Sequence, residues 1–582
     1  MRIPDKEGDR MQFVQDVLQK CIASQEERRS AYRTLKEYYL FGCEGGANQY
    51  GTMNKIYPHI DQAVSFLYSQ DTTRFAVDLD KSVSEMELLK VPALNEAVND
   101  TWHSSDVDLR FGDALTWAHV YGSMFIKPRW HIDHLVPDVV EPHNVGLWRE
   151  DVFGMDNQEA FSHSYQIPKS QLLYELTVAN HPDAEAIVKE AIANTEPPND
   201  NAAQPIDRII TSSAMPDVVG ELNTALGARL SYIPKSAEPM VQMHELFIYD
   251  DEISDFRIFT LANPFVIVYD RPISRIYVAN EVPLIQVCPY PLHDYAWGLS
   301  IVERLIPIQS MRNTRWDQIQ HLMELQAVPP SAGSGFEGNA DEMQDALDTP
   351  GGLVLSDNPG AKMERLQPTI PPDLFDEINF FDDFFNEVTG TTKIMSGQGE
   401  SGVRSEGQAS QLLRVGASRT KRRALIVEDN LEEVATLILK LLKKYSKKKY
   451  RSEDGTEFIA DQFTDEFIVR VDAHSNSPVF MQDMSQMAFA LFKAKAIDRA
   501  ELLELLQVPM KDLLKLKLKT KIEPAEAAAK KAEEAAVAQG KVTKLASKGK
   551  SCQSKHRAST LNRYPKATAT VGASASTNGK DS

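Results

Sequence analysis

The chain has 582 residues and a formal net charge of −20, with 42% hydrophobic and 25% charged residues. This length is too great for one core, so several packed units are expected, with the composition of an ordinary globular protein. The cysteines are widely separated and lack metal-binding spacing, which argues against a disulfide framework and favours a reducing compartment. A membrane span and a secretory signal are not expected, because no run of 18 apolar residues occurs and the N-terminus is charged.

Charge is distributed unevenly along the chain. Residues 521–582 carry 12 basic and 5 acidic residues, which leaves 51 basic and 78 acidic residues in the body. Tight binding to nucleic acid depends largely on Lys and Arg neutralising phosphates. The acidic body is therefore not expected to grip DNA, although it could surround DNA without holding it.

The first 299 residues show patterns of both helices and strands. Helices are expected over 11–39, from 57 onward, between the first two strands and over 167–195, and a long loop or insertion over 196–240. Strands are expected over 75–79, 123–132, 136–142, 243–249, 256–261 and 265–269. This region therefore reads as an α+β domain, within a chain whose fold class is α+β and mainly helical.

Ser300 and Glu303 have the spacing of a capping box and predict the start of a long helix. Apolar residues continue at helical spacing to Ala327, and Pro307 is expected to kink the helix. Residues 331–370 are rich in turn-forming Gly, Pro and Asn, which predicts a small insert with two or three strands.

A second, strongly acidic helix is predicted from Pro371 to Thr389, with Gly390 as its C-terminal stop. An apolar stripe is formed by Leu374, Ile378, Phe381, Phe385 and Val388. The helix has no basic residue and six acidic ones: Asp373, Asp376, Glu377, Asp382, Asp383 and Glu387.

The remaining sequence begins with a glycine-rich loop at 390–407 and a long helix over 408–445. Residues 458–460 and 467–471 are expected to form a hairpin, and 485–518 two or three short helices. The tail is rich in Ala, Lys and Glu and then in Ser, Thr, Ala and Gly, which predicts a marginal helix followed by disorder.

Motifs that suggest an enzyme have weak structural support. Gly397–Gly402 spells GxGxxG, but the preceding element reads as a helix rather than the strand of a dinucleotide-binding unit. Val403 and Arg404 stand where a phosphate-binding loop requires Lys and Ser/Thr. His131 and His134 would diverge if both lay on one strand. We therefore expect no catalytic residue, no cofactor and no metal site.

Two basic clusters have simple explanations. One comprises Arg414, Arg419, Lys421, Arg422 and Arg423 on the long helix. A solvated face or an ion-paired subunit contact is favoured there, and direct DNA contact is the alternative. The other, over 443–451, suits the C-terminal end of a helix dipole.

The sequence resembles the portal proteins of tailed bacteriophages, particularly the podovirus head–tail connector type. The resemblance rests on 289–303 (PYPLHDYAWGLSIVE) and 399–410 (GESGVRSEGQAS), with further support from 54–58 and the strand at 75–79. It extends over about residues 10–520, and the order and spacing of these motifs strengthen it.

The resemblance implies a portal fold that assembles as a dodecameric ring around a central channel at one capsid vertex. Its parts would be an N-terminal wing (1–299), a first stem helix (300–328), a clip (329–370), a second stem helix (371–389), a tunnel loop (390–408), the long helix with the C-terminal wing (409–480), crown helices (481–522) and a basic low-complexity tail (523–582).

The resemblance also implies partners and a location. Double-stranded DNA would pass through the channel during packaging and ejection. The terminase large subunit would dock first and tail adaptor proteins later, with the major capsid protein and scaffolding protein as further partners. The protein would be assembled in the host cytoplasm and reside in the virion at the portal vertex.

Simple electrostatics agrees with this function. Acidic helices repeated around a ring would repel DNA phosphates, so the duplex would slide rather than bind. In the tunnel loop, Lys393 and Arg404 could touch the DNA backbone briefly, and Gly397, Gly399 and Gly402 would let the loop adjust. The alternatives are another ring-forming adaptor or pore protein and, less favoured, an enzyme that binds a nucleotide at Gly397–Gly402.

Overall fold

The computed structural model describes most of the first 471 residues and a short segment near 490. The described residues are 1–44, 52–69, 73–79, 85–131, 133–178, 183–193, 240–263, 266–279, 281–327, 329, 331–334, 339, 341, 343, 345, 347, 358–365, 369, 371, 373–390, 406–452, 455–465, 467–471, 488–494, 496, 497, 499 and 502. The chain divides into two compact units, Met1–Met487 and Ala488–Ser582. In the second unit, residues 488–493 are helical.

The N-terminal helices of the first unit are α1 (Glu7–Ile22), α2 (Gln25–Phe41), α3 (Ile56–Leu67), α4 (Glu85–Leu88), α5 (Val91–Ser104) and α6 (Val107–Tyr121). The prediction of one helix over 11–39 was wrong, because the chain breaks between α1 and α2. At this break the Ser24 hydroxyl hydrogen-bonds to Glu150 instead of serving its own helix.

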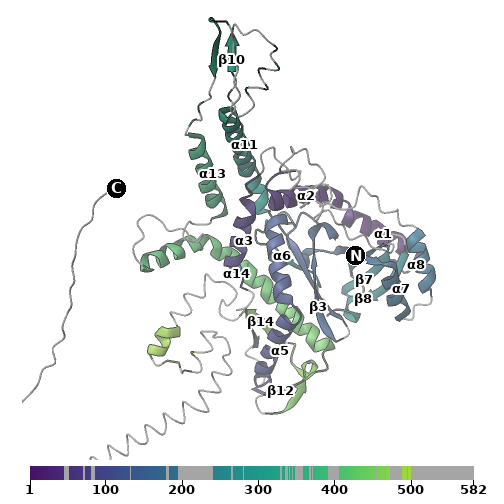
Figure 1. Ribbon diagram of the computed structural model, residues 1–582. Coiled ribbons are helices and arrows are strands. Elements are labelled where there is room, and N and C mark those ends of the chain that lie inside the picture. The colour runs from purple at the N-terminus through teal and green to yellow at the C-terminus, as the bar shows by residue number, and fades with distance from the viewer. Residues whose placement is uncertain are drawn as a thin grey trace, which may run out of the picture. The chain divides into compact units, whose positions relative to one another are not determined.

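Two antiparallel sheets also belong to the N-terminal region (Figure 1). The smaller has the order β3-β2-β9, with β2 at Met124–His131, β3 at His134–Val140 and β9 at Ile285–Val287. The larger is a meander of β4 (Val145–Leu147), β5 (Ala160–Pro168), β6 (Met240–Asp250), β7 (Asp255–Ala262) and β8 (Val266–Pro272).

The strands predicted at the first hairpin and over 243–269 are confirmed, and β5 was missed. The prediction that helix begins at 167 was therefore early, since α7 spans Lys169–Val178 and α8 spans Ala184–Ala193. Short 3-10 helices lie at Pro142–Asn144, Met155–Asn157, Ile273–Arg275 and Ala460–Gln462. The predicted loop at 196–240 lies outside the described residues, apart from Met240 in β6.

A buried polar network joins the two sheets. Lys127 on β2 is 2% exposed, and its ammonium donates to Nδ1 of His163 on β5 (3.2 Å) and to the carboxylate of Glu245 on β6. Burial, reinforced by Lys127, lowers the pKa of His163 to about 3, so this imidazole is a neutral acceptor. Burial acts to raise the pKa of Glu245, but the ammonium of Lys127 outweighs it and holds the pKa below its ordinary value.

The C-terminal part of the first unit completes the core rather than forming a separate layer. Strand β1 (Phe75–Leu79) pairs antiparallel with β14 (Phe467–Val471), while β12 (Lys449–Arg451) pairs with β13 (Glu457–Ile459). The prediction of a hairpin between 458–460 and 467–471 was therefore wrong. Its two strands go to different partners because a 3-10 turn and the buried Phe463 separate them.

Helix α14 (Glu406–Tyr445) crosses the first unit and packs against β2, β9, β14, α3 and α5. The predicted stripe is confirmed, since Val427, Leu431, Val434, Ile438 and Leu441 are all buried. At its C-terminal end, Lys443 and Lys444 donate to main-chain carbonyl oxygens of other segments, including that of Thr464 at 2.8 Å. The second basic cluster thus fastens the helix end as well as suiting its dipole.

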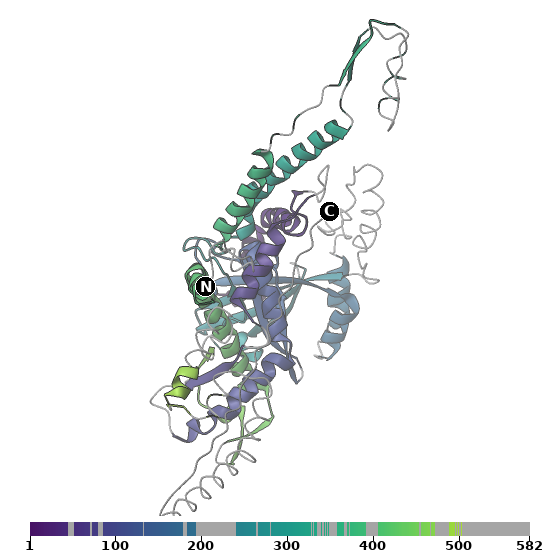
Figure 2. The same cartoon turned by 60° about the vertical axis from the view of Figure 1, so that its left-hand side comes forward.

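Helices α11 (Ile301–Ala327) and α13 (Asp373–Thr389) lie side by side and extend away from the sheets (Figures 1 and 2). At their far end, β10 (Ser331–Ser334) and β11 (Lys362–Arg365) form an antiparallel pair. The predicted helix boundaries are confirmed, and α11 continues through Pro307. Gly390, at a φ of +74°, ends α13 as expected.

Candidate functional site: the projecting helix pair

Ion pairs fasten α11 to α13 and to the segment before α3. The guanidinium of Arg312 is almost fully buried and lies 3.1 Å from the carboxylate of Asp382, which Lys55 also approaches at 3.1 Å. Nearer the far end, Arg315 contacts Glu377 at 2.8 Å, with both side chains over one-third exposed. These contacts require the two helices to run antiparallel.

Main-chain carbonyls of the N-terminal region anchor the base of α11. Arg312 and Gln309 both donate to the carbonyl oxygen of Met53 at 3.1 Å. Asn313 donates to the carbonyl oxygen of Gly42 at 2.8 Å and accepts from Gln309, also at 2.8 Å. Because these polar groups are buried and satisfy one another, the base of the helix pair is held in one orientation.

The apolar stripe of α13 packs towards α3. Phe381 and Phe385 are buried, and the ring of His59 on α3 stacks on Phe385 with centroids 5.5 Å apart. Leu374, Ile378 and Val388 are half-buried. The stripe predicted from sequence is thus the packing face of α13.

The six acidic residues of α13 do not share one environment. Glu377 and Asp382 are half-buried and ion-paired. The other four carboxylates are exposed, at Asp373, Asp376, Asp383 and Glu387. These four exposed carboxylates contribute most of the acidic surface of α13, because Glu377 and Asp382 are half-buried.

The motif at 289–303 connects the helix pair to the core. Arg423 of α14 donates to the Tyr290 hydroxyl (2.6 Å) and to the carbonyl oxygen of Thr389 (3.2 Å), at the end of α13. These residues, with Arg304 and Arg422, line a cavity of about 280 Å³. The Ser300 hydroxyl accepts from the N–H groups of Val302 and Glu303, which confirms the serine half of the predicted capping box.

The glycine of this motif has a required conformation. Gly298 has a φ of +67°, and a Cβ there would collide with the Cys288 sulfur and approach the carbonyl oxygen of Gly122 at 3.1 Å. The Ser123 hydroxyl donates to the neighbouring carbonyl of Trp297 at 2.6 Å. The motif is thus a tightly packed junction between α6, α11 and α14.

His119 of α6 packs edge to face against Tyr290 and is fully buried. Its Nδ1 donates to the carbonyl oxygen of Leu115 (2.8 Å), and Nε2 has no partner among the described residues. Burial lowers the pKa of His119 from 6.5 to about 4. The folded state therefore resists protonation, and its stability falls as the pH drops from about 6.5 towards 4.

Replacing His119 by phenylalanine should remove this acid sensitivity. Between pH 7 and pH 4.5, the free energy of unfolding should fall by about 2 kcal/mol more in the parent than in the His119→Phe variant. Urea unfolding at both pH values measures the change. His134→Gln, at an exposed turn, is the control and should keep the pH dependence of the parent. An equal pH dependence in His119→Phe and the parent would contradict the assignment.

The other residues that the sequence singled out have different outcomes. Lys393, Gly397, Gly399, Gly402 and Arg404 lie outside the described residues. Of the basic cluster on α14, whose side chains are described from Lys421 onward, Arg423 is a structural link rather than a solvated cation. The expected divergence of His131 and His134 was wrong. They face each other across the β2–β3 turn with ring centroids 5.6 Å apart, because two strands meet there.

Sequence reasoning missed the cations that organise the site. Arg312 and Arg315 lie one turn apart on α11 and both contact carboxylates of the acidic helix. This spacing could have predicted the contact, because an acidic helix with no basic residue of its own can form ion pairs only with basic residues of a neighbouring element. The contacts of Lys55 and Arg423 come from distant segments and left no local pattern.

The described residues form an α+β body that carries a projecting antiparallel helix pair with a small hairpin at its end (Figure 1). The family model described as "Phage SU10 portal protein" matches residues 136–502, more than half of the chain. The chain therefore belongs to this phage portal protein family, which is structural rather than enzymatic.

Other comparisons add little. A chain of a solved structure, "Virion of native gene transfer agent (GTA) particle", is similar over 82% of this chain and 93% of that chain, with 9% identity and a TM-score of 0.37. This likeness is too low to carry an argument. No curated protein sequence matches the chain. Within the described residues, no helix has the length and apolar character needed to cross a membrane.

Proposed function

We propose that this protein is the subunit of a dodecameric portal ring at one capsid vertex, through which double-stranded DNA is packaged and later ejected. The membership of the portal family over residues 136–502 is the observation that carries this proposal. The projecting helix pair gives it a physical basis, because its exposed carboxylates would repel DNA phosphates rather than bind them.

We assign the parts of the subunit by the resemblance to portal proteins, and the described fold supports this division. Residues 1–299 with 409–480 form the wing, joined by the β1–β14 pairing. Helices α11 and α13 form the stem within 300–328 and 371–389, and the β10–β11 pair belongs to the clip at 329–370. The tunnel loop is assigned to 390–408, the crown to 481–522 and a basic tail to 523–582.

The partners follow from the same assignment. The clip receives the terminase large subunit during packaging and tail adaptor proteins afterwards, and the wing meets the major capsid protein and the scaffolding protein. Assembly takes place in the host cytoplasm, and the ring remains in the virion. Electron microscopy of the purified protein tests the central claim by counting subunits around the axis. A protein that stays monomeric, even with its shell and scaffolding partners, would overturn it.

Shortening the loop at 391–404 separates assembly from DNA handling. The ring should still form, because the described contacts of the wing and stem lie outside this segment. Retention or packaging of DNA should fall, since Lys393 and Arg404 are assigned to transient contact with the duplex. Particle counts by electron microscopy and the DNA content of filled heads measure the two effects. Failure of the rings to form would show that the loop assignment is wrong.

A further inference from the structure

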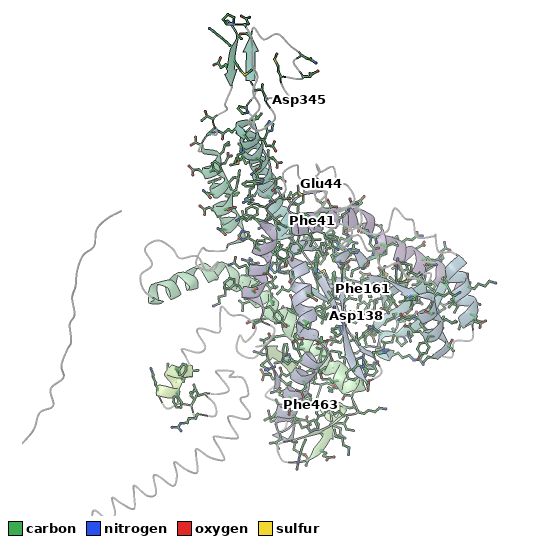
Figure 3. The ribbon with its side chains drawn as sticks, in the orientation of Figure 1. Phe41, Glu44, Asp138, Phe161, Asp345 and Phe463 are labelled. Atoms are coloured by element: carbon green, nitrogen blue, oxygen red, sulfur yellow. The ribbon has the colours of Figure 1, made fainter. Side chains whose placement is uncertain are left out.

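A basic cavity lies where the start of α11 and the end of α13 meet α14 (side chains in Figure 3). Three guanidinium groups line it, that of Arg304 from α11 and those of Arg422 and Arg423 from α14. Among the described residues that line the cavity, none carries a carboxylate, although the chain has a net charge of −20. Positive charge is thus concentrated at one junction of an acidic protein.

Two of these three cations have no partner within the described part of the chain. Arg423 is held by the two hydrogen bonds that link α14 to Tyr290 and to the end of α13. Arg304 and Arg422 are exposed, and neither side chain forms an ion pair or a hydrogen bond with a described residue. Their N–H groups are therefore available to a bound anion.

The tyrosine of the lining adds a hydroxyl donor. The Tyr290 oxygen accepts from Arg423 at 2.6 Å, so its own hydrogen is left for another acceptor. Burial raises the pKa of Tyr290, and the positive charges of Arg423 and Arg304 act against this rise, so both cations act on the hydroxyl. Arg423 also donates to the last carbonyl of α13, which offsets the negative end of that helix dipole.

The nearby carboxylates lie outside the cavity. Glu303 and Glu387 adjoin the lining in sequence but are exposed, so water and salt screen their charges. Asp383, Asp376 and Asp373 lie further along α13, roughly 9 to 24 Å from its end by the rise of the helix. An anion in the cavity would therefore contact guanidinium groups directly, with the acidic charges screened by solvent.

A phosphate group has the charge and shape that this lining favours. Guanidinium groups bind phosphate oxygens through two parallel hydrogen bonds. The cavity of about 280 Å³ is large enough for a phosphate group with several waters, since one water occupies roughly 30 Å³ in the liquid. Pro289, Leu292 and Leu299 supply apolar walls, so the arginines and Tyr290 would direct the anion.

We propose that this cavity binds a phosphate group of the DNA backbone. The inference rests on the proposed portal function, because Gly390 lines the cavity and begins the segment 390–408 that is assigned to the bore. Arg304 and Arg422 contact the phosphate, and Arg423 positions Tyr290 beside it. The duplex is thus repelled along the acidic helix and held weakly at the base of this loop.

Arginine footprinting tests the site directly. Phenylglyoxal modifies accessible guanidinium groups, and peptide mass spectrometry measures the extent at each residue. In assembled rings, a short duplex should lower the modification of Arg304 and Arg422 about 2-fold or more, since a duplex contacts only some subunits at a time. Arg110 and Arg275, exposed elsewhere in the body, are the controls and should react equally with and without DNA. Inorganic phosphate at the same concentration should protect less, because it lacks the multiple contacts of a duplex.

A charge-matched pair of double variants tests the effect on DNA binding. Arg304→Gln/Arg422→Gln should weaken binding of a labelled duplex to the rings and reduce the slope of log affinity against log salt by about 1 or more. Arg110→Gln/Arg275→Gln removes the same charge elsewhere and should keep the slope of the parent. Fluorescence anisotropy measures both, and electron microscopy should show rings in all variants.

The outcomes separate this inference from the proposed function. Rings whose Arg304 and Arg422 react equally with and without DNA would overturn the site and leave the portal function standing. Protection by ring assembly alone would show that a neighbouring subunit fills the cavity, and lack of reaction in the monomer would show that the chain itself fills it. Either result overturns the inference, as does equal protection by inorganic phosphate. Absence of both rings and protection by DNA would contradict the inference and the proposed function together.

Discussion

The Arg312→Ala variant should open the base of the helix pair, at a cost of about 3 kcal/mol. The substitution leaves Asp382 with Lys55 as its remaining ion-pair partner and removes a donor to the carbonyl of Met53. Hydrogen exchange of the α13 amides reports this opening locally, and about 3 kcal/mol corresponds to roughly 100-fold faster exchange.

The neighbouring cation provides the matched control. Arg315 also pairs with a carboxylate of α13, but both side chains are over one-third exposed. Exposed ion pairs contribute at most about 1 kcal/mol, so Arg315→Ala should accelerate exchange less than about 5-fold. Equal acceleration in the two variants would show that burial of Arg312 does not anchor the helix pair.

The Lys127→Met variant should lose about 3–4 kcal/mol of stability in urea unfolding. The methionine fits the space but leaves the Glu245 carboxylate, four-fifths buried, without its cation. The network links the two sheets, so their packing should loosen together. Tryptophan fluorescence and circular dichroism should report the same lowered urea midpoint.

Removing the unpaired charge of Glu245 as well should restore part of the lost stability. The double variant Lys127→Met/Glu245→Gln has no buried ion, and it should recover at least half of the lost stability. A single variant as stable as the parent, or a double variant less stable than the single one, would contradict the view that unpaired charge causes the loss.

The elements predicted well are those with strong local signals. The bounds of α11 and α13 follow from Ser300, Pro371 and Gly390, which act within one turn of the helix ends. The strands of the larger sheet follow from runs of aromatic and β-branched residues. Family membership was also predictable, because the residues at 289–303 fall where the structure needs a tightly packed junction.

Other features depend on contacts between distant segments. Nothing local to 75–79 or 467–471 shows that these strands pair with each other. The break between α1 and α2 depends on Glu150, and β5 is fixed by pairing with β6 across the insertion. The acidic helix was recognised in full, but its division into half-buried and exposed carboxylates required the positions of Arg312, Arg315 and Lys55.

The pairing of β1 with β14 also bears on synthesis. A nascent chain presents β1 early, yet the strand's partner is made almost four hundred residues later, after α14. Until then the edge of β1 is open, and a chain terminated before residue 467 can never close it. Prematurely ended products thus lack the strand that completes this part of the body.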